Sequence, residues 1–116
     1  MSAPRPAPSA RRSLERAAPV FAALGDETRL RLVARLSAGE PSSIARLTGG
    51  SDMTRQAITK HLHVLASAGL VRSVRRGRER FWELEPKRLG DARRALDQIS
   101  EQWDDALARL KAFVER

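Results

Sequence analysis

Residues 51–71 read SDMTRQAITKHLHVLASAGLV, a polar opening followed by a helical repeat and a closing glycine. Ile58, Leu62 and Leu65 recur at the spacing of one helix face, which predicts that this face is buried. The opposite face carries hydrogen-bonding or cationic side chains: Gln56, Thr59, Lys60 and His63. The stretch therefore predicts a helix from about Thr54 to Ala68 with one side for the core and one side for a partner.

The composition favours a polyanionic partner. The chain has 116 residues, enough for one compact domain, and carries 22 Lys plus Arg against 14 Asp plus Glu, a formal net charge of +8. Charge alone leaves DNA, RNA and a membrane surface open. The absence of cysteine excludes disulfides and thiolate metal sites. No apolar run is long enough for a membrane span or a signal peptide, so a cytoplasmic protein with no membrane partner is expected.

The N-terminal residues 1–16 combine prolines and arginines with almost no large apolar side chains. Such a composition does not offset the entropy of ordering, so a flexible basic tail is predicted. It could contact DNA phosphates as an arm, but a solvated leader without a specific role is the favoured interpretation. The remaining residues, 17–116, are expected to form a single domain that serves both DNA binding and dimerisation.

Glycine and proline divide the chain before residue 51 into three shorter helices. The first is predicted to start at Pro19 and to stop at Gly25, after which Asp26 can cap the second. A third, short helix precedes a turn at residues 48–52. Two helices joined by a glycine-containing turn are typical of a helix-turn-helix. The three helices carry Val20, Phe21, Leu24, Leu30, Val33, Leu36, Ile44 and Leu47.

Residues 70–76 and 79–84 are two β-capable runs around Gly77, which predicts a hairpin. In a winged helix-turn-helix such a hairpin lies beside the recognition helix, and its basic tip contacts the DNA backbone or the minor groove. The alternative is that the charges only protect an edge strand from pairing. The basic residues of this wing are Arg75, Arg76, Arg78 and Arg80.

The C-terminal helix, predicted from about Asp91 to Val114, repeats apolar residues with a period of 3.5. At roughly 36 Å it is longer than the small preceding core can cover, which favours pairing with a second subunit over packing on its own domain. A homodimer would present two recognition helices about 34 Å apart to a pseudo-palindromic operator. The apolar seam expected at this interface consists of Leu96, Ile99, Trp103, Ala106, Leu107, Leu110 and Phe113.

The long helix carries side chains suited to reading base edges in the major groove. Arg55 and Lys60 can reach guanine or phosphate, and Gln56 can pair with adenine. Thr54 and Thr59 offer hydroxyl groups. The alternative is an ordinary solvated helix face, which the adjacent basic hairpin makes the weaker interpretation. Double-stranded DNA is the predicted partner.

The two histidines do not predict a metal site. His61 and His63 are two apart on a helix and point about 200° from each other, so they cannot bind one ion together. His61 is expected to be packed or to bond a DNA phosphate. No serine, histidine and carboxylate grouping suggests catalysis, so no enzyme activity and no cofactor are expected.

From Val20 to Val114 the sequence resembles the ArsR/SmtB family of bacterial winged-helix repressors. The resemblance rests on residues 21–32, FAALGDETRLRL, on residues 54–62, TRQAITKHL, on residues 68–71, AGLV, and on the Arg76-Gly77-Arg78 turn. It implies a mainly α-helical fold with a small β-hairpin, about five helices and a two-stranded wing. It also implies a homodimer through the first and last helices, which adds Val20, Phe21 and Leu24 to the interface, and repression of its own or a neighbouring operon.

The chain departs from the metal-sensing members of that family. Residues 41–47 contain no cysteine and residues 91–116 contain no histidine, so the metal-sensing mechanism is not carried over. Any small-molecule effector is left unidentified by motif. The primary hypothesis is a dimeric, sequence-specific transcriptional regulator, a repressor. The competing hypotheses are a winged helix that binds protein rather than DNA and an RNA-binding domain.

Overall fold

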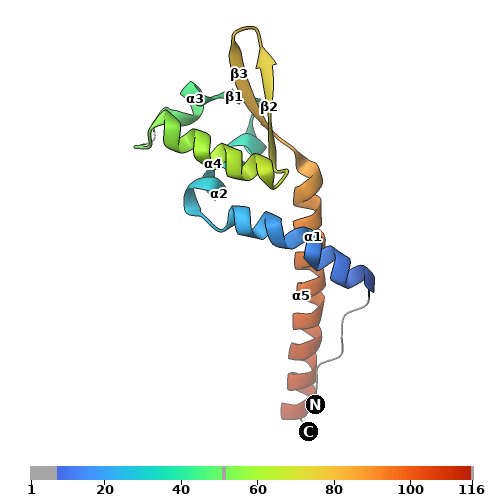
Figure 1. Cartoon of the computed structure of the whole chain (residues 1–116). Helices are drawn as coiled ribbons and strands as arrows, with labels where there is room; N and C mark the ends of the chain where they lie inside the picture. The colour runs from blue at the N-terminus through green and yellow to red at the C-terminus, as the bar shows by residue number, and fades with distance from the viewer. Residues whose placement is uncertain (1–7, 51, 116) are drawn as a thin grey trace.

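The computed structural model describes residues 8–50 and 52–115, which form five helices and a small antiparallel sheet whose β2–β3 hairpin projects from one end of the molecule (Figure 1). Four helices and the sheet gather at one end of the last helix, whose C-terminal half extends away from them (Figure 1). The molecule is accordingly elongated, with extents of 66 × 29 × 23 Å. The elements are α1 Pro8–Leu24, α2 Glu27–Ala38, β1 Ser42–Ser43, α3 Ile44–Thr48, α4 Arg55–Ser67, β2 Val71–Arg76, β3 Glu79–Leu84 and α5 Pro86–Val114.

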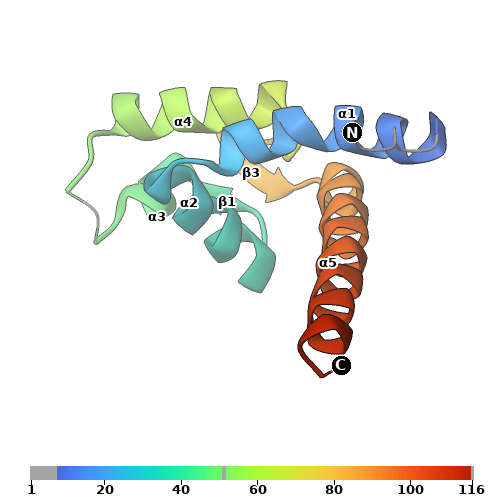
Figure 2. The ribbon, with the colours of Figure 1, turned by 90° about the horizontal axis from the view of Figure 1, so that it is seen from below.

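The core lies where the helices meet the base of the sheet. Ile58, Leu62 and Leu65 of α4 are at most 2% exposed, which confirms the buried face predicted from their spacing. Seen from below, α1 and α4 run along one side of the molecule, and α2 and α3 lie under α4 (Figure 2). The other large side chains of the core are Val20, Leu32, Val33, Leu36, Leu47, Leu70, Val71 and Trp82.

Side-chain caps determine where three helices begin. The Asp26 carboxylate accepts a hydrogen bond from the backbone N–H of Arg29 at 3.0 Å, as predicted for the start of α2. Ser43 caps α3, and the Thr54 hydroxyl caps α4 by accepting from the backbone N–H of Ala57 at 3.1 Å. Each cap satisfies one of the N–H groups that a helix leaves unpaired at its first turn.

The predicted start of α1 at Pro19 is wrong, because α1 begins at Pro8 and Pro19 lies inside it. A proline there removes one helical hydrogen bond. Burial offsets that loss: Ala17 and Val20, on either side of Pro19, are each 1% exposed. Residues 8–16, expected to belong to a flexible tail, are therefore helical, whereas the expectation for residues 1–7 lies outside the described residues.

The sheet has three strands in the order β1-β3-β2, so the predicted hairpin gains a strand. In β1, Ser42 and Ser43 pair with Trp82 and Phe81 of β3. A strand of two residues is too short to leave a periodic signal in the sequence. α5 begins at Pro86, five residues before the predicted Asp91, because a proline is well suited to the first turn of a helix. Among the described residues, no helix combines the length and apolarity needed to cross a membrane.

Candidate nucleic-acid interface

The outer face of α4 presents polar side chains to solvent. Arg55, Gln56 and Lys60 are exposed, so their functional groups are available to a partner. Thr54 uses its hydroxyl as the helix cap, and the Thr59 hydroxyl donates to the carbonyl of Arg55 at 2.7 Å. Arg55, Gln56, Thr59 and Lys60 line one side of α4, whereas Thr54 precedes the helix as its cap. The two threonine hydroxyls already have partners in the helix backbone.

A shallow groove runs along this face between α4 and the first residue of α3. Its volume is about 630 Å³ and its lining is mainly apolar. Sequence reasoning missed it, because only the three-dimensional packing of α3 on α4 brings Ile44 beside the outer face of the longer helix. The lining residues are Ile44, Arg55, Gln56, Thr59, Lys60 and His63.

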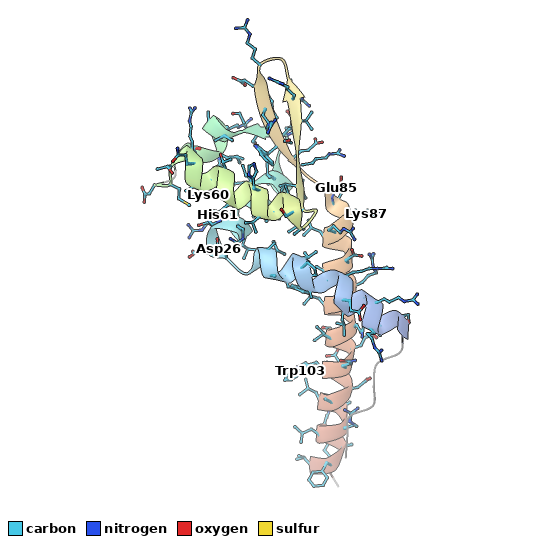
Figure 3. All side chains as sticks on the ribbon, viewed as in Figure 1. Asp26, Lys60, His61, Glu85, Lys87 and Trp103 are labelled. Carbon is cyan, nitrogen blue, oxygen red and sulfur yellow. The ribbon has the colours of Figure 1, made fainter. Side chains whose placement is uncertain are left out.

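His61 connects α4 to the junction of α1 and α2 (Figure 3). Its Nδ1 lies 3.8 Å from the Asp26 carboxylate and 3.3 Å from the Arg29 guanidinium, whose Nε donates to the carbonyl of Ala23 at 2.6 Å. The backbone N–H of Arg29, followed by the charges of Arg29 and His61, lowers the pKa of Asp26 from its ordinary value. This cluster fixes the position of α4, and contact of His61 with DNA stays a prediction.

The pleat of the wing separates its arginines onto two faces. Arg75 pairs across the strands with Arg80, two residues along from the Ser73 and Trp82 pair, so these arginines share the face of Trp82. The Trp82 ring lies 6.0 Å from the ring of His63, which places that face on the side of α4. Arg76 belongs to the other face, where its guanidinium lies 5.6 Å from the centre of the Phe81 ring.

Positive charge is compensated by carboxylates at the base of the wing but not at its tip. At the tip, Gly77 has a φ of 65° and is followed by the exposed Arg78. At the base, Arg72 is neutralised by Glu83 at 2.6 Å and by Glu85 at 3.2 Å, and these carboxylates raise the pKa of Arg72. The uncompensated positive charge of the wing therefore lies toward its tip, at the four basic residues predicted from the sequence: Arg75, Arg76, Arg78 and Arg80.

The predicted dimer residues fall into two groups. Val20 is 1% exposed within the core of this chain, and Phe21 and Leu24 pack partly against that core. The residues on α5 are instead exposed: Trp103, labelled in Figure 3, is 65% exposed and Phe113 is 70% exposed. The exposed seam comprises Leu96, Ile99, Trp103, Leu107, Leu110 and Phe113.

Comparison with known proteins agrees with this geometry. A family model described as a helix-turn-helix domain matches residues 24–74, from the end of α1 into the wing. The HTH-type transcriptional regulator Rv2034 of Mycobacterium tuberculosis is 36% identical over 93 residues, which cover 80% of this chain and 83% of the relative. No three acidic or histidine side chains in the described part of the chain gather as a metal site.

Solved structures extend the similarity to the whole fold. A homodimeric winged helix-turn-helix domain from Mycobacterium bovis, Mb0332, is 21% identical with a TM-score of 0.61, covers 90% of this chain and 93% of its own, and supports the fold. An ArsR-like transcriptional regulator from Rhodococcus sp. RHA1 is 38% identical with a TM-score of 0.72, and the match covers 87% of this chain and 94% of the regulator. The chain thus belongs to the ArsR family of winged helix-turn-helix transcriptional regulators, which are DNA-binding proteins and not enzymes.

Proposed function

We propose that the protein is a homodimeric repressor that binds a pseudo-palindromic operator in front of its own or a neighbouring operon. α4 enters the major groove, and the wing follows the adjacent backbone or minor groove. One observation carries this proposal: the wing face that bears Arg75 and Arg80 is turned toward α4. These arginines share the face of Trp82, which lies beside α4, and α4 itself exposes Arg55 and Lys60. Such a protein acts on the chromosome and hence in the cytoplasm.

The dimer is supported by the bare apolar seam on α5. Six large apolar side chains between 47% and 70% exposed on one helix form a patch that monomeric proteins seldom present to water. The winged helix-turn-helix domain of Mb0332 from M. bovis, which shares the fold, is homodimeric. Two-fold pairing of this chain would place two copies of α4 on successive turns of one DNA face.

A binding assay on the region upstream of the protein's own gene tests the proposal. At ~150 mM salt we expect a pseudo-palindromic duplex to be preferred over a random duplex by on the order of a thousandfold or more. Equal affinity for both would contradict sequence-specific regulation. Repression follows if the bound operator overlaps the promoter, and in vitro transcription then falls as protein is added.

Two variants separate base reading from phosphate binding. Gln56→Ala should cost roughly 1 to 3 kcal/mol at one base position and relax the preference there, because the amide pairs with a base edge. Arg78→Ala should weaken all sequences alike and lower the salt dependence by about one released ion, because it contacts only phosphate. Affinities for the operator and for each single-base change are the measurement. If Gln56→Ala weakened binding to all sequences equally, as is expected for Arg78→Ala, the base-reading assignment of Gln56 would be wrong.

A further inference from the structure

The groove on the outer face of α4 differs chemically from the rest of that face. Arg55 and Lys60 are among its lining residues, yet the surface of the groove is mainly apolar. Ile44, half-buried at the start of α3, contributes a branched hydrocarbon side chain to this lining. A face that bound only phosphates would gain nothing from an apolar lining.

Thr59 adds a second hydrocarbon group beside Ile44. Its hydroxyl is turned toward the helix backbone, where it donates to the carbonyl of Arg55 at 2.7 Å. The methyl group is the other branch of the same carbon, so it is the part of Thr59 left to line the groove. Ile44 and the methyl group of Thr59 are therefore two hydrocarbon groups in a lining that also contains Gln56 and His63, and we call these two groups the hydrocarbon pair.

We propose that the hydrocarbon pair of Ile44 and Thr59 binds the 5-methyl group of a thymine in the operator and selects thymine at one position of each half-site. The inference rests on the proposed entry of α4 into the major groove. There thymine alone of the four bases presents a methyl group, and apolar side chains are its natural partners. The groove is open and has a volume of about 630 Å³, and the hydrocarbon pair within it would make the contact that discriminates thymine from the other bases.

Charge favours DNA over an apolar small molecule as the occupant. A small apolar ligand gains nothing from the cationic side chains of Arg55 and Lys60 in the lining, whereas DNA places phosphates on both sides of the base edges. His63, which lines the groove, lies 6.0 Å from the ring of Trp82 on the wing face that carries Arg75 and Arg80. A lining that combines hydrocarbon with cations suits a base methyl group flanked by phosphates.

The test replaces single thymines by 2′-deoxyuridine, which pairs identically but lacks the methyl group. The operator is first obtained by selection from random duplexes with the full-length protein. At one thymine in each half-site, deoxyuridine should weaken binding by about fourfold, equivalent to about 0.8 kcal/mol for one buried methyl group. All other thymines should change the affinity by less than twofold.

Thr59→Ser keeps the hydroxyl and removes only the methyl group, and Ile44→Ala removes the second contact. Loss of the fourfold discrimination in either variant supports the proposal. Thr48→Ser is the matched control, because Thr48 makes the same type of bond to the carbonyl of Ile44 but does not line the groove. Thr59→Ser also keeps the test decisive should Ile44→Ala fail to fold.

Three results would overturn the inference in distinguishable ways. If the wild type binds its operator but no thymine is sensitive to deoxyuridine, the groove assignment fails and the proposed function stands. If both variants retain the fourfold discrimination, another part of the protein contacts the methyl group. If no operator is selected at all, the proposed function fails and the inference falls with it.

Discussion

At the scale of single residues, the carboxylate of Asp91 shows how α5 pairs a buried charge within its own first turns. Asp91 is 6% exposed, and it is bonded by Arg88 at 3.4 Å and by Arg94. A buried charge is tolerated only when it is paired, and here both partners lie within one turn of α5. The hydrogen bond from Arg94, followed by that from Arg88, lowers the pKa of Asp91.

This pairing predicts the acid sensitivity of the fold. Because the pKa of Asp91 is lower in the folded than in the unfolded chain, its stabilising contribution is complete above about pH 4 and is lost as the pH falls through the lowered value. Asp91→Asn should be less stable than wild type at pH 7 and should show a flatter decline below pH 4. Chemical denaturation at several pH values measures this. Parallel profiles for the two proteins would argue against the assignment.

Gly69 is the second residue whose identity the structure requires. It ends α4 with a φ of 77°, and a Cβ there would lie 2.8 Å from Cγ of Arg88. Gly69→Ala should cost more than the roughly 1 to 2 kcal/mol of a left-handed alanine. Gly77→Ala is the control, because Gly77 has a φ of 65° and nothing within 4 Å. Equal losses of unfolding free energy in the two variants would show that the Arg88 side chain moves aside without a loss of stability.

At the scale of elements, the sequence predicted those with strong periodicity and failed where tertiary packing decides. The apolar spacing of Ile58, Leu62 and Leu65 predicted α4, and Gly77 predicted the hairpin. The start of α1 could not be predicted, because the burial of Ala17 outweighs the disruption by Pro19 only once the rest of the domain is in place. The groove at Ile44 escaped prediction for the same reason, since its walls come from two helices.

The wing shows a conflict between stability and binding. Arg75 and Arg80 stand directly opposite each other, an arrangement of like charges that destabilises a strand pair. Arg80→Gln should therefore raise stability by a few tenths of a kcal/mol while weakening binding to all DNA sequences and lowering the salt dependence by about one ion. Thermal unfolding and salt-dependent binding measure the two effects. Unchanged DNA affinity would remove Arg80 from the interface.

At the scale of the whole molecule, α5 is too long for the domain it belongs to. Its first turns are buried through Asp91, Ala92 and Ala95, whereas every described residue from 99 onward is exposed. An isolated helix with such an apolar stripe gains stability only through packing. We therefore expect folding of the C-terminal half of α5 to depend on association.

A charge placed in the seam tests that expectation. Leu110→Glu should yield a monomer in sedimentation and lose most of the operator affinity, because one α4 then binds without its partner. Ala108→Glu carries the same charge beside the seam on α5 and should remain dimeric. Trp103 offers an independent readout, since its emission should shift to the blue as wild-type protein associates. A monomeric wild type would contradict the proposed assembly.

The shortest strand has a consequence for how bases are discriminated. Ser43 pairs with Phe81 of β3 in the wing and also caps α3 in the helix-turn-helix. Because one residue belongs to both units, the wing cannot tilt to follow a narrower minor groove without moving the start of α3. Base changes under the wing and under α4 should therefore combine non-additively. A weight matrix that treats operator positions as independent would misjudge the affinity of sites altered at both places.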